Sequence, residues 1–150
     1  MSELRELYQE LILDHTKRPR NFGTIEPATC TAEGYNPLCG DKLTLYLVVE
    51  DGRIKDVSFQ GKGCAISTAS ASLMTEAIKG KTSDEVAAIF TRFREAVTSP
   101  IDHELDLEQL GKLAALAGVR EFPLRVKCAV LAWHTMRAAL EGRHEIVRTE

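Results

Sequence analysis

The sequence predicts an α+β protein in which helices pack on one face of a small antiparallel three-stranded sheet. Strand-like runs gather between residues 28 and 60, and helix-like runs occupy most of the remaining chain. Strands that are segregated from helices along the sequence are typical of α+β folds. The chain has 150 residues, of which 44% are hydrophobic, so one domain over residues 1–150 with its own core is expected.

Helical periodicity and stop signals place the helices in order. The first is expected over residues 3–16, where leucines recur at helical spacing, and Pro19 and Gly23 end it. The second is expected from Ala65 to Gly80. Either Thr82 or Ser83 can cap the third, which should run to about Ala96. A short helical piece over 106–118 and a last helix from Phe122 to about Glu141, ended by Gly142, complete the set.

The strands are expected over 28–34 and on either side of Asp51-Gly52, a strong hairpin signal. With a two-residue turn at Asp51-Gly52, Cys39 faces Cys64 across the hairpin. With a three-residue loop that starts at Glu50, Cys64 falls one residue past the partner of Cys39. In both registers the two thiols lie at the same end of the hairpin.

The apolar pattern favours the three-residue loop. In that register Leu43 lies opposite Phe59 and Leu45 lies opposite Val57, which gives one clean apolar face. This register is therefore the preferred prediction.

Composition and charge exclude several classes of protein. The formal net charge is −3, so the chain is not expected to bind nucleic acid. No apolar run approaches the roughly 20 residues that span a bilayer, and the first 15 residues lack an apolar signal core. A cytoplasmic location is expected, where thiols stay reduced and a cysteine cluster usually means metal binding or catalysis.

Cys39 and Asp41 lie two residues apart in the segment NPLCGD. Side chains at this spacing in an extended segment point the same way, and a thiolate and a carboxylate repel each other unless a cation lies between them. Cys64 should reach the same end of the hairpin because Gly61 and Gly63 loosen the backbone there. It also begins a helix, whose N-terminus stabilises a thiolate.

Cys128 is expected in the second turn of the last helix, and its thiolate should be favoured by Arg125 and Lys127 close by in sequence. Its apolar neighbours also allow a plain buried core cysteine. Three thiolates and one carboxylate suit zinc or an iron–sulfur cluster. Cys30 is the rival fourth ligand, but it lies outside any tight motif and is interpreted as a small apolar or partly exposed residue. The four histidines are weaker candidates: His15, His103, His134 and His144.

Four segments carry a family resemblance: DHTKRPRNFG at 14–23, GYNPLCGD at 34–41, FQGKGCAISTASASLM at 59–74 and PLRVKC at 123–128. Over nearly its whole length the chain resembles the IscU/NifU-like iron–sulfur cluster assembly family. The scaffold branch has a histidine immediately before the third cysteine, where this chain has Lys127. The segment around 97–120 is also longer here. Both features resemble the SufU-type branch of zinc-dependent sulfurtransferases.

That resemblance implies a Zn²⁺ site made by Cys39, Asp41, Cys64 and Cys128, with Cys39 as the catalytic sulfur carrier. It implies a SufS-type cysteine desulfurase as sulfur donor and downstream Suf assembly components as recipients. It also implies that a histidine of the partner takes a coordination position and frees Cys39. Arg125 and Lys127 match the arginine and lysine that precede the cysteine in that branch, and they are expected to support sulfur transfer.

Two alternatives remain at this point. The same ligands could hold a transient [2Fe–2S] cluster, which would make the chain an assembly scaffold. A structural zinc domain without sulfur chemistry is the third reading, but it does not explain why a carboxylate joins three thiolates.

Overall fold

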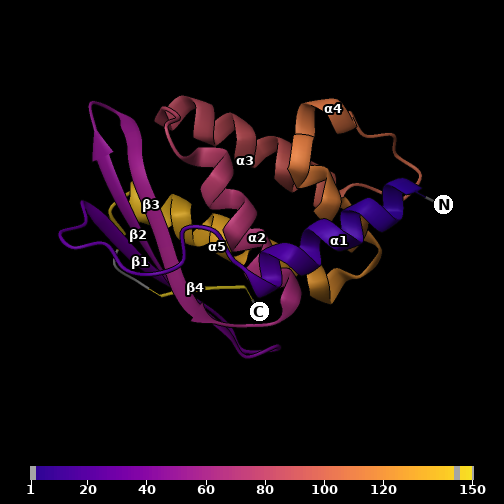
Figure 1. Ribbon diagram of the computed structural model, residues 1–150, viewed down its shortest axis with the longest axis horizontal. Coiled ribbons are helices and arrows are strands. Elements are labelled where there is room, and N and C mark those ends of the chain that lie inside the picture. Colours follow the sequence, from indigo (N-terminus) through magenta and orange to yellow (C-terminus); the bar gives the residue numbers. More distant parts are fainter. Residues whose placement is uncertain (1–2, 144–145, 150) are drawn as a thin grey trace.

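A computed structural model describes residues 3–143 and 146–149, and Figure 1 shows its arrangement. His144 lies outside the described residues. The helices are α1 (Glu3–Lys17), α2 (Ala65–Ile78), α3 (Ser83–Thr98), α4 (Leu107–Leu110), the 3₁₀ helix η1 (Gly111–Glu121) and α5 (Pro123–Leu140). The strands are β1 (Cys30–Asn36), β2 (Asp41–Glu50), β3 (Arg53–Lys62) and β4 (Val147–Arg148).

The predicted α+β class is confirmed, with helices gathered on one side of the sheet in Figure 1. The sheet differs from the prediction in one respect. It has four described strands in the order β3-β2-β1-β4, because β4 pairs in parallel with β1. Two residues are too few to show an alternating pattern, so the sequence gives no signal for this strand.

The hairpin register corrects the preferred prediction. Glu50 pairs with Arg53, so Asp51 and Gly52 form a two-residue turn, and both have positive φ (54° and 73°) as a type I′ turn requires. A bulge then shifts the register between Val48 and Val49. The prediction of a three-residue loop was wrong. The apolar residues of β2 and β3 are brought onto one face by the bulge, which no sequence signal marks, and not by a longer loop.

Beyond the bulge, Leu45 lies opposite Phe59 and Leu43 lies opposite Gly61. A side chain at Gly61 would collide with the backbone of Lys42, and φ there is 152°. Glycine is therefore required where β3 bends at the end of the hairpin that carries Cys64.

The helix ends follow the sequence signals closely. Thr82, one of the two predicted N-cap residues, caps α3 and forms a capping box with Glu85. Gly142, with φ of 72°, follows α5 as predicted. The expected short helical piece is longer and tighter: it comprises α4 and η1, so much of it is 3₁₀ rather than α-helix.

The core lies between the sheet and the helices. Helix α5 packs on β1 and β2, while α2 lies against both α5 and α1. Trp133 of α5 is fully buried and stacks on Phe93 of α3, with ring centroids 4.6 Å apart. Within the described residues, no helix is long and apolar enough to cross a membrane.

Candidate metal centre

The site lies where three parts of the chain meet at one end of the sheet. Strand β1 ends at Asn36, which pairs with Asp41 at the start of β2, and the turn between them carries Cys39. Cys64 immediately precedes α2, and Cys128 lies in α5. The β1–β2 turn and the two helices therefore place three thiols and one carboxylate around one point.

Cys39, Asp41 and Cys128 form the tight part of the site. Their ligand atoms all lie within 4.8 Å of one another. The Sγ atoms of Cys39 and Cys128 are 3.3 Å apart, and both thiols are free. Cys39 is exposed, whereas Cys128 and Asp41 are buried. The arrangement is therefore a pocket of buried donors closed by one exposed thiol.

Cys64 stands at the edge of this group. Its Sγ lies 3.9 Å from Oδ2 of Asp41 and accepts a hydrogen bond from the backbone N–H of Ser67 at 3.4 Å, which makes it the N-cap of α2. It is not among the three residues whose donor atoms are mutually within 4.8 Å.

Asp41 is fixed from the side that faces away from the thiols. Its Oδ1 accepts a hydrogen bond from the backbone N–H of Cys64 at 2.8 Å. A Cβ at Gly63 would lie 2.9 Å from the same oxygen, so only glycine lets the backbone pass this close. Oδ2 remains turned toward the sulfur atoms.

Asn36 is a site residue that sequence reasoning missed, although it stands in the quoted motif. It is completely buried, and its Nδ2 donates to Asp41 Oδ2 at 3.3 Å and approaches Cys128 Sγ at 3.5 Å. Its Oδ1 accepts from the N–H of Leu38 at 3.3 Å, which shapes the turn that carries Cys39. The signal was its position directly before Pro37, where a side-chain acceptor commonly organises a turn.

The pKa of Cys128 corrects one expectation. It is raised, first by burial and then by hydrogen bonding with Cys39 and Cys64. Neither Arg125 nor Lys127 is among the groups that shift this pKa, so closeness in sequence does not lower it as expected. Without a cation, the thiol of Cys128 is held in its protonated form.

A soft cation fits this donor set. In a tetrahedral thiolate site the sulfur atoms lie about 3.8 Å apart, close to the Cys39–Cys128 separation. Buried thiols and a buried carboxylate on one point are unfavourable as anions unless a cation neutralises them. Cys39, Asp41 and Cys128 can hold such an ion as they stand, and Cys64 can complete the set.

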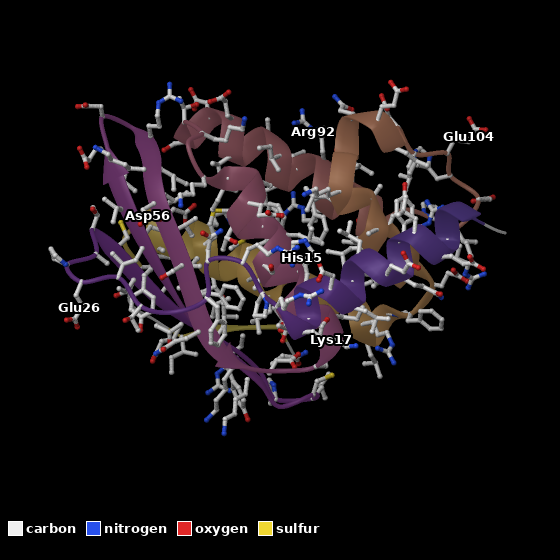
Figure 2. The ribbon with its side chains drawn as sticks, viewed as in Figure 1. His15, Lys17, Glu26, Asp56, Arg92 and Glu104 are labelled. Carbon is white, nitrogen blue, oxygen red and sulfur yellow. The ribbon has the colours of Figure 1, made fainter. Side chains whose placement is uncertain are left out.

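The other sequence candidates lie elsewhere. Cys30 pairs with Leu47, at the opposite end of β1 from Asn36. His134 lies on α5 and packs against Phe90 with ring centroids 5.3 Å apart. His103 is exposed before α4. Buried His15 contacts Ser72 of α2, and Figure 2 shows it where α1 passes that helix.

Fold and site together define an α+β protein with a cluster of thiols and one carboxylate at one end of its sheet, where Cys39, Asp41 and Cys128 are close enough to hold a cation. The chain belongs to the NifU-like N-terminal domain family, whose sequence model matches residues 7–129. The resemblance found in the motifs is thereby confirmed.

Similar proteins include both branches of the family. The iron–sulfur cluster assembly scaffold protein IscU of Streptococcus pyogenes serotype M1 is 38% identical over 94% of this chain and 87% of its own. The zinc-dependent sulfurtransferase SufU of Bacillus subtilis strain 168 is 38% identical over 90% of each chain. A crystal structure of the iron–sulfur cluster assembly scaffold protein for the SUF system (FiSufU) from Fervidobacterium islandicum AW-1 superposes with a TM-score of 0.80 at 38% identity. The match covers 91% of this chain and 98% of that one.

Proposed function

We propose that the chain is a zinc-dependent sulfur acceptor that takes persulfide sulfur from a SufS-type cysteine desulfurase for iron–sulfur cluster assembly. The observation that carries this proposal is the contrast between Cys39 and Cys128. Their sulfur atoms lie 3.3 Å apart, yet Cys39 is exposed and Cys128 is only 2% exposed. One thiol of the site can therefore meet the sulfur of another protein.

Zinc would be held by Cys39, Asp41, Cys64 and Cys128, and when bound it keeps thiols in their thiolate form at neutral pH. The thiolate of Cys39 attacks the outer sulfur of a cysteine persulfide on the desulfurase. A new S–S bond forms on Cys39, the S–S bond of the donor breaks, and the donor cysteine leaves as a thiolate. The exchange needs no added oxidant or reductant, because one persulfide replaces another.

The surroundings of the site support the docking of a partner. Leu38 is 58% exposed next to Cys39, and Phe122 and Leu124 at the start of α5 are 54% and 62% exposed. Exposed apolar side chains are typical of protein–protein contact sites, and these three lie within six residues of Cys39 or Cys128 in the sequence. Exposed Arg125 lies beside them and can pair with an acidic partner.

Two sequence observations favour zinc over an iron–sulfur cluster as the bound group. Lys127, rather than histidine, precedes Cys128, and the named Bacillus subtilis relative is a zinc-dependent sulfurtransferase. The second candidate function is a scaffold that holds a transient [2Fe–2S] cluster on the same ligands. The relatives of Streptococcus pyogenes and Thermotoga maritima, the latter 42% identical over 90% of this chain, are named scaffold proteins and favour it.

Two measurements on protein purified without air test the proposal. The first is metal content with an absorption spectrum: colourless protein with about one zinc per chain supports the sulfur acceptor, whereas iron with visible absorption supports the scaffold. The second is alanine release from cysteine by a SufS-type desulfurase. The chain should accelerate release, Cys39→Ser should not, and Cys30→Ser is the matched control that should. Equal acceleration by Cys39→Ser would overturn the assignment of the sulfur carrier.

A further inference from the structure

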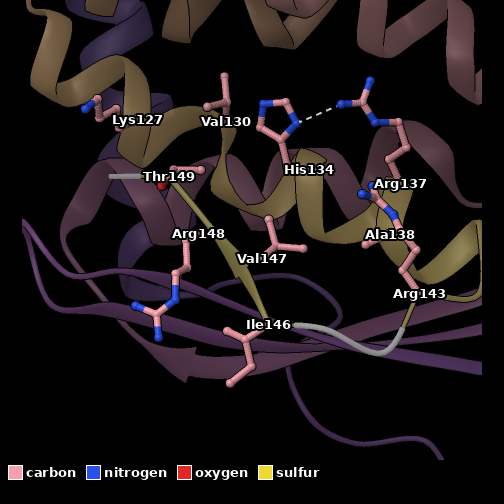
Figure 3. A pocket seen from close by; sticks show the side chains of 10 residues that line it. All are labelled: Lys127, Val130, His134, Arg137, Ala138, Arg143, Ile146, Val147, Arg148 and Thr149. Carbon is pink, nitrogen blue, oxygen red and sulfur yellow. Dashed lines mark hydrogen bonds between the residues drawn. The ribbon is translucent and has the colours of Figure 1, made fainter.

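A second pocket lies on α5, between that helix and the C-terminal segment 146–149 (Figure 3). Its volume is about 460 Å³, which is within the usual size of small-molecule sites. Ten residues line it: Lys127, Val130, His134, Arg137, Ala138, Arg143, Ile146, Val147, Arg148 and Thr149.

The described lining of this pocket is cationic. It includes one lysine, three arginines and a histidine, and none of the ten residues is acidic. The whole chain, by contrast, has a net charge of −3. Among the described residues, Arg143 is the only one of these cations paired with a carboxylate, that of Glu141 at 3.0 Å. Positive charge is therefore concentrated here without matching negative charge in the described lining.

Arg137 is held in place by uncharged groups. Its guanidinium lies 5.0 Å from the centroid of the Phe90 ring and is half-buried. It also donates to Nδ1 of His134 at 3.2 Å. An arginine can only donate, so Nδ1 is the acceptor and the neutral ring carries its proton on Nε2. A half-buried guanidinium fixed on an aromatic ring has donors to spare for an oxyanion.

The pKa of His134 also reflects the positive charge around the pocket. Its pKa is lowered by burial and by three arginines, Arg137 on α5, Arg94 on α3 and Arg143 after α5. An anion in the pocket would offset these charges and raise that pKa. Figure 3 shows Arg137 and Arg143 at one end of the pocket and Lys127 at the other.

A hydroxyl group in the lining also lacks a partner. Oγ1 of Thr149 is buried and makes no hydrogen bond to any described residue. A buried hydroxyl without a partner is costly. This oxygen has almost no accessible surface, so it could donate to an oxyanion in the pocket only after the side chain rotates.

We propose that this pocket binds a small polyanion that carries two or more carboxylate or phosphate groups. The permanent cations supply attraction, and the guanidinium of Arg137 supplies a fork of donors. The volume of about 460 Å³ is that of a small-molecule site. The site is separate from the thiol cluster, and the inference does not depend on sulfur transfer.

The experiment titrates the intact protein with tripolyphosphate and with citrate at a fixed ionic strength of about 0.15 M, where diffuse attraction is screened. The ring signals of the histidines are followed by NMR. We expect saturable shifts of the His134 ring and an increase of its pKa, so affinity should rise as the pH falls from about 8 to about 6. His103 is exposed on another part of the surface and is the internal control.

Three variants complete the test. Arg137→Gln and Arg143→Gln should each weaken binding about tenfold. Lys55→Gln removes one charge from an exposed side chain elsewhere and should leave affinity unchanged. Arg143 is exposed, so Arg143→Gln keeps the test decisive if Arg137→Gln does not fold. Equal weakening by Lys55→Gln, equal shifts at His103, or the absence of saturation would overturn the proposal.

Discussion

Asp41 Oδ1 accepts the backbone N–H of Cys64 at 2.8 Å, which ties the start of β2 to the residue that caps α2. The carboxylate thus has two roles that depend on different oxygens. One oxygen closes the junction between strand and helix, and the other faces the thiols. Substitutions at Asp41 should separate these roles.

The first prediction compares Asp41→Asn with Asp41→Ala. Asparagine keeps an oxygen that can accept from Cys64, but it loses the charge, and its amide NH2 cannot accept from Asn36 as Oδ2 does. The metal-free fold should therefore be destabilised less than by alanine, while zinc binding weakens. Alanine loses both roles and leaves the buried N–H without an acceptor, which should lower the free energy of unfolding by about 1–3 kcal/mol. Urea unfolding of the metal-free proteins measures the difference. Equal destabilisation by both variants would contradict the division of roles.

The second prediction concerns Asn36, whose amide lies against both Asp41 and Cys128. Asn36→Ala removes buried hydrogen bonds and the acceptor for the N–H of Leu38, so it should cost about 1–3 kcal/mol of stability. It should also weaken zinc binding, because partners behind the ligands orient them and typically contribute about 10–100-fold in affinity. Competition with a zinc chelator measures the affinity. Leu38→Ala, a variant in the same turn, is the control and should keep the zinc affinity of the parent.

His15 shows where sequence reasoning stopped short of the structure. The heptad-like leucines of the first helix predicted α1 almost to the residue, yet they gave no reason to bury a histidine. Its Nδ1 lies 2.6 Å from Oγ of Ser72, which also accepts the backbone N–H of Arg20. Such a contact joins residues 57 positions apart, and no local pattern encodes it.

The site shows the same division between local and long-range information. Spacing placed Cys39 and Asp41 on one turn, and both possible hairpin registers brought Cys64 to the same end. The bulge at Val48 and the two-residue strand β4 could not be predicted, because each depends on packing rather than on local propensity.

The third prediction follows from the buried state of His15. Nδ1 of His15 is hydrogen-bonded to Ser72, and Nε2 has no hydrogen-bond partner among the described residues. Its pKa is lowered by burial and by Arg20, and Glu76 offsets this only in part. The folded state therefore disfavours protonation. Its contribution to stability is complete above the unfolded pKa of about 6.5 and is lost as the pH falls below it.

Unfolding free energy measured between pH 7.5 and 5 should therefore decrease toward the acidic end. His15→Asn keeps a side-chain acceptor near Ser72 but cannot titrate, so its stability should decrease less than that of the parent over this interval. The remaining decrease comes from His134, whose pKa is also lowered in the folded state. The pKa of Asp14, lowered to about 2 by hydrogen bonds to Arg20 and Arg18, acts at more acidic pH and does not interfere. A parent protein whose stability decreases no more than that of the variant would contradict this account.

The last prediction concerns removal of the metal. A bound ion would connect the β1–β2 turn to the start of α2 and to α5. It would add metal–ligand bonds to the thiol contacts and to the hydrogen bonds of Asp41 and Asn36 that join these segments at the site. Binding to the folded state alone stabilises it, so a chelator that strips zinc should lower the melting temperature by at least about 5 °C. Cys128→Ser and Cys64→Ser should lose tight zinc binding and melt like the stripped parent. Cys30→Ser, whose thiol lies at the far end of β1, should keep both its zinc and the chelator-dependent shift. If Cys30→Ser lost its zinc, the ligand set would be wrong, and if verified metal loss left the melting curve of the parent unchanged, the ion would not hold these segments together.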